Sequence, residues 1–168
     1  MRESEELFDV VDDQDRVLEQ LPRSVVHARK LLHRAANVFV FNSVGELLLQ
    51  FRSATKDEYP QCYTSSASGH LSAGEDYAES AQREMNEEIG INTPLEWLEK
   101  FPGTPQNANE HTVLFRTYSN GPFTFDPGEI ERGEFFEFTS IDKMLREDEE
   151  QFTPPFRQLY RWYRENYD

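Results

Sequence analysis

The chain has 168 residues, with 32 acidic against 17 basic side chains and a formal net charge of −15. The length fits one domain with a substantial core. The charge argues against non-specific binding to nucleic-acid polymers or anionic membranes. It does not exclude a phosphorylated small molecule, because a bound metal can offset the local field.

A single cysteine, Cys62, excludes an intramolecular disulfide and a cysteine-only zinc site. No apolar run is long enough to span a bilayer, and residues 1–13 contain no signal-peptide core, so a cytoplasmic location is expected.

The first third of the chain predicts two hairpins. Short apolar runs at 7–11 and 17–18 flank the turn-like sequence DDQDR and predict a small β-hairpin ahead of the main domain. Residues 23–34 fit helical or extended spacing, and the choice stays open. The β-rich runs 36–42 and 46–52, joined by a turn that contains glycine, predict a central and well-covered hairpin.

The rest of the chain predicts further strands and two more helices. A loop at 53–62 precedes a short strand at 63–68, and residues 102–109 read as a polar loop. Strands are expected at 95–101, 111–118 and 134–138. Ser140 can cap a short helix that runs to residue 145, and Thr153 caps a last helix with Pro154 at its first position. The expected buried face of this last helix consists of Phe156, Leu159, Tyr160 and Tyr163.

One helix between these strands has clear signals at both ends. Asp76 can cap its N-terminus, and Glu79, three residues on, completes a capping-box pair. Gly90 fits the position where a left-handed residue ends a helix. The expected apolar stripe of this helix consists of Ala78, Ala81, Met85 and Ile89.

The same helix carries a cluster of acids beside that stripe. Glu84, Glu87 and Glu88 stand at i, i+3 and i+4 and therefore share one edge, where like charges repel. Mg²⁺ or Mn²⁺ reverses that repulsion because hard cations prefer carboxylate oxygen. Arg83 is placed to pair with Glu87. The glycine-bounded loop 69–74 can bring backbone carbonyls toward a metal.

The whole stretch resembles the signature of the Nudix hydrolase superfamily. That signature reads Gly, five residues, Glu, seven residues, then Arg-Glu-apolar-any-Glu-Glu-any-Gly-apolar. A solvated acidic helix face is the alternative, but it explains neither Gly69, Glu75 nor Arg83. The residues that fill the nine fixed positions are Gly69, Glu75, Arg83, Glu84, Met85, Glu87, Glu88, Gly90 and Ile91.

The resemblance implies a fold and an activity. The fold is α+β or α/β, a Nudix-type α/β/α sandwich around a mixed sheet. Residues 1–168 would form a single domain, with an N-terminal extension at 1–34 and a core at 35–165. The activity is metal-dependent hydrolysis of a diphosphate linkage by water attack on phosphorus, with Mg²⁺, or Mn²⁺, as the cofactor. The partner is a small-molecule diphosphate. A homodimer is compatible with the family, although the sequence does not show one.

The resemblance also assigns roles to the motif residues. Glu87 and Glu88 become metal ligands, and Glu84 a further ligand or the base. Glu75 either binds a second metal or is structural. Gly69 offers its carbonyl to the metal, and Arg83 orients the glutamates, so the catalytic set is Arg83, Glu84, Glu87 and Glu88. Family members often recruit another acid from outside the motif, for which the candidates are Glu110, Glu129, Glu131 and Glu134.

Substrate contacts are less specified. Arg52 and Lys56 follow a strand near the motif and can touch phosphate, with solvated side chains as the alternative; Glu110 is a third candidate contact. Three aromatic residues are candidates to stack on a base or to belong to the core, namely Phe51, Tyr59 and Tyr63. Nothing in the sequence separates nucleotide substrates from prenyl diphosphates.

A finer resemblance points to the isopentenyl-diphosphate isomerase branch of the superfamily and to bacterial Nudix proteins of the same layout. In the isomerase, a Cys just before the Gly-His pair acts on the substrate, and a histidine-rich site holds a metal. Here Ser68 replaces that Cys, and a serine hydroxyl is a poor acid or base.

The other isomerase positions match in part. His33 and His70 match two histidines, whereas His27 falls one residue out of step. Glu110 matches one acid of an Asn-Glu pair, and Ala108 replaces the Asn. Three hypotheses therefore remain: a diphosphate hydrolase, which the intact motif favours, an isomerase-like enzyme, and a non-catalytic diphosphate-binding module.

Overall fold

The computed structural model describes residues 5–167, so residues 1–4 and 168 of the expected domain lie outside the described part. The strands are β1 Leu7–Val11, β2 Val17–Pro22, β3 His33–Phe41, β4 Leu47–Arg52, β5 Tyr63–Thr64, β6 Ala67–His70, β7 Glu96–Phe101, β8 Glu110–Tyr118 and β9 Ile130–Phe136. The helices are α1 Arg23–Ala28, α2 Tyr77–Ile89, α3 Phe138–Glu147 and α4 Pro154–Asn166. Short 3₁₀ turns lie at Pro105–Asn107 and Glu149–Gln151.

Strand β3 is the centre of a mixed sheet of seven strands. It runs parallel to β8 and antiparallel to β4 and β6, and the main order of the sheet is β5-β4-β3-β8-β7. The hairpin predicted from β3 and β4 is confirmed at its turn, where Phe41 faces Leu47. Beyond that pair, β6 takes the place beside β3, and β5 and β9 lie beside β4. Both faces of β3 are buried, which explains its nearly continuous apolar sequence.

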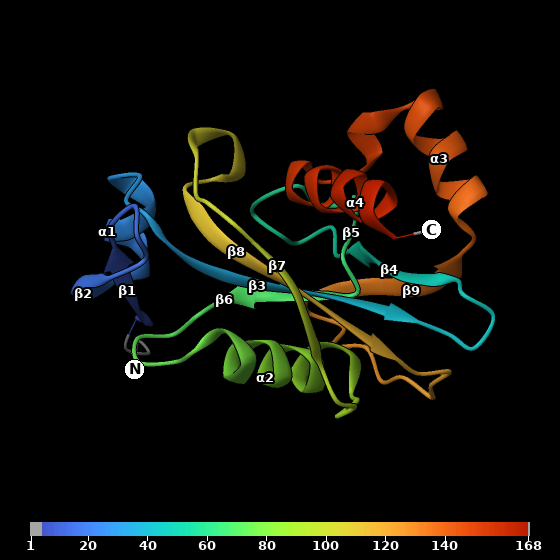
Figure 1. Ribbon diagram of the computed structural model, residues 1–168, viewed down its shortest axis with the longest axis horizontal. Coiled ribbons are helices and arrows are strands. Elements are labelled where there is room, and N and C mark those ends of the chain that lie inside the picture. The colour runs from blue at the N-terminus through green and yellow to red at the C-terminus, as the bar shows by residue number, and fades with distance from the viewer. Residues whose placement is uncertain (1–4, 168) are drawn as a thin grey trace.

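Helices cover both faces of this sheet, as Figure 1 shows. Helix α2 packs on one face through Ala81, Met85 and Ile89. Helices α3 and α4 cover the other face, and the residues predicted for α4 are all buried there. The α/β/α sandwich expected from the sequence is therefore confirmed.

The ends of α2 match the sequence prediction. Asp76 accepts a hydrogen bond from the Glu79 backbone, Glu79 accepts one in return, and Gly90 ends the helix at φ 74°. The predicted stripe was wrong at one position, because Ala78 is exposed. Tyr77 is buried instead, since its ring packs against Trp97 of β7 and its hydroxyl bonds Asp15.

Several predicted boundaries were wrong. Residues 63–68 form two strands, β5 and β6, that pair with different neighbours, β4 and β3. Strand β9 begins at Ile130, before the predicted 134, and ends at Phe136, where its partner β4 turns away. Helix α3 begins at Phe138 rather than after Ser140, because the Phe138 ring packs into the core under α3 and α4.

The N-terminal hairpin is confirmed as a two-stranded sheet, and α1 settles the open choice at 23–34. Phe8, Val10 and Val26 form its own small core. Main-chain hydrogen bonds tie it to the main body, from Ala73 N to the Leu7 carbonyl (2.8 Å) and from Val11 N to the Leu32 carbonyl (3.0 Å). The hairpin therefore lies directly against the loop that begins the signature motif. Within residues 5–167, no helix is long and apolar enough to cross a membrane.

Candidate active site

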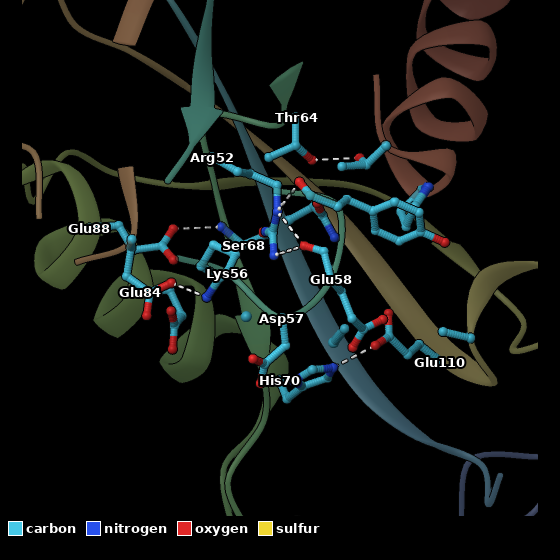
Figure 2. Close-up of a pocket in the computed structure, with 18 of the residues that line it drawn as sticks. Arg52, Lys56, Asp57, Glu58, Thr64, Ser68, His70, Glu84, Glu88 and Glu110 are labelled. Atoms are coloured by element: carbon cyan, nitrogen blue, oxygen red, sulfur yellow. Dashed lines mark hydrogen bonds and ion pairs between the residues drawn. The ribbon is translucent and has the colours of Figure 1, made fainter. Parts of the chain in front are cut away.

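A pocket of about 700 Å³ lies between the start of the signature motif, the N-terminal hairpin and the first turn of α4. Figure 2 shows two chemically different groups in it, with Glu84 and Glu88 on one side and His70 and Glu110 on the other. Ser68 and Lys56 lie between them in this view. The pocket collects most of the residues that the sequence singled out.

Glu88 is the buried member of the acidic edge of α2, only 8% exposed. One of its oxygens accepts hydrogen bonds from the Ser68 backbone N–H (3.0 Å) and from the Gln50 amide (3.2 Å). Burial and the nearby charge of Glu84 raise the pKa of Glu88 to about 8. Burial likewise raises the pKa of Glu84, although Arg83 opposes the shift. A bound cation would remove both the cost of burying these charges and the repulsion between them. Carboxylates in such an environment are therefore favourable ligands for a cation.

Arg83 connects the acids to the loop that precedes them. Its guanidinium donates to both oxygens of Glu75 (2.7 and 3.0 Å), to Glu84 (2.6 Å) and to Glu87 (3.3 Å). It also donates to the His70 carbonyl at 3.4 Å. Burial alone would raise the pKa of Glu75, but the bonds from Arg83 and from the Ser72 N–H lower it. Glu75 does not line the pocket, whereas Arg83, Glu84 and Glu87 do.

Gly69 allows α2 to approach strand β6. A Cβ atom at this position would lie 2.3 Å from Cδ of Glu84, closer than real atoms come. Only glycine therefore lets the backbone pass beside the carboxylate, and this close approach is the physical reason for the first glycine of the signature.

The candidates for substrate contact and for an extra acid divide into two groups. Arg52 and Lys56 line the pocket, but Arg52 donates to the Glu58 and Tyr59 carbonyls and Lys56 pairs with Glu129. Glu110 and Glu129 line it as well. The two acids that do not, Glu131 and Glu134, pair with Arg132 at 2.9 and 3.1 Å.

Of the three aromatic candidates, only Tyr59 lines the pocket, where it is half-exposed. The Phe51 and Tyr63 rings pack edge to face with each other. The Arg132 guanidinium covers the Phe51 ring at 3.9 Å from its centre. These two aromatic residues therefore stabilise strands rather than line the site.

A cluster of histidines lies at the other side of the pocket. The side chains of His27, His33 and His70 come together with ligand atoms within 4.8 Å of one another, and their ring centroids are 5.2–5.3 Å apart. Glu110 accepts a bond from His70 Nε2 at 2.5 Å. His27 was expected to be out of step with the other two histidines, but its ring lies beside both of theirs.

Electrostatics in this cluster favour an ionised carboxylate at Glu110 and a neutral imidazole at His27. Burial opposes ionisation of Glu110, but the nearby His33 ring, 3.5 Å away, and the hydrogen bond from His70 lower its pKa to about 2. Burial and the neighbouring His70 and His33 lower the pKa of His27. Neutral imidazole is the form of histidine that binds metals.

Several residues that line or support the pocket had no recognisable signal in the sequence. Gln50 bonds Glu88 from a strand 38 positions earlier, and Glu6, Arg23 and His27 reach the pocket from the N-terminal extension. Only a resemblance to the isomerase branch pointed toward His27, and there the spacing was wrong by one residue.

Residues 31–162 match the NUDIX domain family model, so the chain belongs to the Nudix family. Its members include relatives named as Nudix hydrolases, and the chain is accordingly an enzyme acting on diphosphate linkages. Nudix hydrolases generally use a divalent metal and small-molecule diphosphates.

Three similar proteins illustrate this membership. The chain is 33% identical over 165 residues to the uncharacterized Nudix hydrolase YfcD of Escherichia coli, covering 97% of this chain and 89% of that protein. The structure of DR0079 from Deinococcus radiodurans matches with a TM-score of 0.76 and 26% identity, over 85% of this chain and 90% of that one. The Nudix domain of Shewanella oneidensis NrtR, solved with ADP-ribose, has the same fold at 13% identity, with a TM-score of 0.64 and coverage of 86% and 98%.

Proposed function

We propose that the protein hydrolyses a small-molecule diphosphate with the help of Mg²⁺ or Mn²⁺ held by the acidic edge of α2. The observation that supports this most strongly is the convergence of Glu84, Glu88 and Gly69. The buried Glu88 and the partly buried Glu84 lie together there, and Glu84 faces a stretch of backbone that has no Cβ. Carboxylate and carbonyl oxygens form the donor set that these hard cations prefer. When bound, such a metal offsets the charge of the diphosphate and lowers the pKa of an attacking water.

The roles of the chain's own residues follow from their contacts. Glu87 and Glu88 would hold the metal, with Gly69 offering its carbonyl. Glu84, whose pKa is raised, would be a further ligand or accept the proton of the attacking water. Arg83 would fix the rotamers of Glu84 and Glu87, and it is itself held by Glu75, so we assign Glu75 a positioning role.

Recognition of the phosphate groups would fall to Arg52 and Lys56 above the pocket. Both are paired in the ligand-free protein, so an incoming phosphate would compete with the Glu58 carbonyl for Arg52 and with Glu129 for Lys56. The N-terminal extension belongs to the same functional unit in this proposal, since Glu6 and Arg23 also line the pocket. A cytoplasmic location and a homodimer stay predictions.

The histidine cluster supports an isomerase-like enzyme as a second candidate, because His27 joins the histidines that match that branch. Ser68 opposes it, since its hydroxyl cannot replace a thiol as acid or base near neutral pH.

A screen of diphosphate compounds tests both candidates. It would measure Mg²⁺-dependent phosphate release and, for isopentenyl diphosphate, isomerisation, with Glu87→Gln run in parallel. We expect release that requires both the metal and Glu87. Isomerisation without release would favour the second candidate, and metal binding with no turnover of any compound would favour a binding module.

A further inference from the structure

A buried amide on the central strand faces the pocket without a hydrogen-bond partner. Asn37 lies on β3, is only 6% exposed and lines the pocket. Neither its amide nitrogen nor its amide oxygen bonds any residue in the described part of the chain. The side chain offers both a donor and an acceptor. A ligand that closes the pocket over Asn37 must therefore supply matching groups, or it leaves a buried amide unpaired.

The other buried amides show that this feature is specific to Asn37. Gln50 and Asn107 are buried to the same degree within residues 5–167. Gln50 donates to a backbone carbonyl and to Glu88, each at 3.2 Å. Asn107 accepts from a backbone N–H (2.7 Å) and donates to a backbone carbonyl (3.0 Å). These two amides stabilise the protein itself, whereas the amide of Asn37 makes no such bond.

Strand β3 places Asn37 close to the acidic edge of α2. Asn37 is paired with Ser68 of β6, and the Ser68 N–H donates to Glu88 at 3.0 Å. Neighbouring strands lie about 4.8 Å apart, so Asn37 is one strand away from the backbone that bonds Glu88. Ala35, two residues earlier on the same face of β3, lines the pocket with only a methyl group. A molecule whose diphosphate lies at the acidic edge can therefore reach Asn37 with the group that the diphosphate carries.

The walls of the pocket are unsuited to a hydrocarbon chain. Among the described residues that line it, none is Leu, Ile, Val, Met, Phe or Trp. The apolar part of the lining comes from Ala35, Tyr59, Ala108, Pro154 and Pro155. Sites for apolar ligands are lined mainly by large aliphatic and aromatic side chains, because their affinity comes from burying apolar surface. A hydrocarbon placed against Asn37 would also leave its amide unpaired, and unpaired polar groups of this kind discriminate strongly between ligands.

We propose that Asn37 is a specificity-determining residue that hydrogen-bonds the polar moiety attached to the diphosphate, so that the enzyme accepts diphosphates of sugars or nucleosides and rejects those of prenyl alcohols. The inference rests on the proposed function, which places the diphosphate at the acidic edge of α2. It goes beyond that function because it names the side chain that distinguishes one substrate class from another.

The experiment measures binding separately from turnover. Calorimetric titrations of the full-length protein in Mg²⁺ use three ligands in which a methylene group replaces the bridging oxygen of the diphosphate, so that this linkage cannot be hydrolysed. The first is α,β-methylene-ADP-ribose, which represents the polar class. The second is geranyl methylenediphosphonate, which represents the prenyl class. The third is methylenediphosphonate alone, which reports on the phosphate contacts.

Two variants separate recognition from stability. Asn37→Leu keeps the approximate size of the side chain and removes its donor and acceptor. Asn107→Leu is the matched control for stability, because it removes a buried amide whose groups are bonded within the protein. Thermal unfolding without ligand should show a lower Tm for Asn107→Leu and an unchanged or higher Tm for Asn37→Leu, since the latter loses no bond within the protein.

We expect the wild type to bind the ADP-ribose analogue more tightly than the geranyl compound. Asn37→Leu should weaken binding of the ADP-ribose analogue about tenfold or more and should leave binding of methylenediphosphonate unchanged. The preference over the geranyl compound should shrink or reverse. With ADP-ribose itself as the substrate, the variant should raise KM more than it lowers kcat.

Three results would overturn the proposal. The first is no binding of the ADP-ribose analogue by the wild type, or tighter binding of the geranyl compound. The second is equal affinity of the wild type and folded Asn37→Leu for the ADP-ribose analogue. The third is a loss of Tm in Asn37→Leu as large as that in Asn107→Leu, which would assign Asn37 a structural role. The expected pattern of binding without hydrolysis of any diphosphate would support the role of Asn37 and contradict the proposed hydrolase instead.

Discussion

The acidic edge of α2 and the histidine cluster are two polar groups in one pocket that the fold builds in opposite ways. The three acids lie within five consecutive positions of a single helix, whereas the cluster takes one side chain from each of four elements. The acids offer only oxygen, and the cluster offers mainly nitrogen. The two groups meet at the end of β6, where Gly69 touches Glu84 and the next residue, His70, bonds Glu110. The end of β6 therefore contributes to both groups. The two groups differ in chemistry and in how far apart their residues lie in the sequence.

Glu88→Gln should cause the largest loss of turnover, and it changes the acidic edge of α2 without changing the histidine cluster. The amide keeps an acceptor for the Ser68 N–H but loses the charge that a cation needs. We expect turnover to fall by about 10²–10⁴-fold with the fold intact, measured as Mg²⁺-dependent phosphate release. Wild-type turnover in this variant would contradict the role proposed for Glu88.

A change at the strand end that the two groups share should also lower turnover. Gly69→Ala introduces a Cβ that overlaps the Glu84 carboxylate, so the Glu84 side chain must shift from its position beside Glu88. We expect a loss of turnover of about 10²-fold, because displacements near 1 Å have effects of that size. Gly128→Ala is the control, since its Cβ would meet nothing closer than 3.4 Å. If both alanine variants behaved alike, the close packing at Gly69 would have no functional meaning.

Arg83→Lys should have a smaller effect, confined to the acidic edge. Lysine keeps the charge but cannot bond Glu75, Glu84 and Glu87 at once, as the guanidinium does. We expect kcat to fall about tenfold, with little change in KM if Arg83 orients acids rather than binds substrate. A large rise in KM at constant kcat would instead indicate direct contact with the substrate.

The smallest effect on turnover should follow from Asp15→Asn, which loosens the N-terminal hairpin at a distance from both sites. Asp15 accepts bonds from Arg34 (2.7 Å) and Tyr77 (2.8 Å) and pairs with Lys100. Removing the charge should lower the free energy of unfolding by roughly 2–4 kcal/mol. Thermal unfolding at pH 7 measures this loss.

The same residue predicts a dependence on pH. Burial opposes ionisation of Asp15, but the bonds from Lys100, Arg34 and Tyr77 lower its pKa below the ordinary 3.8. The folded protein therefore binds this proton less tightly than the unfolded chain, so the stabilisation is present above pH 3.8 and is lost as the pH falls through the lower folded value. Asp15→Asn should flatten that part of the Tm–pH curve. If the slope of Tm against pH were unchanged in the variant, groups other than Asp15 would cause the loss of stability in acid.

Much of the fold was predictable because its signals are local. The capping pair of Asp76 and Glu79, and Gly90 at the far end, fixed helix α2 within one turn. The boundaries that were missed depended on partners elsewhere in the chain. Strand β9 ends where β4 turns away, and Phe138 starts α3 because its ring enters the core beneath α4.

The same division holds for the two polar groups of the pocket. The sequence by itself determined the acidic edge, since helical geometry alone brings residues three and four apart onto one side. Only the tertiary structure decided that His27 joins His33 and His70, and that Gln50 and Ser68 meet Glu88. Such contacts depend on how α1 is placed relative to the main sheet and on which strands become neighbours. Long-range packing of the whole chain determines that arrangement, and no local pattern of residues encodes it.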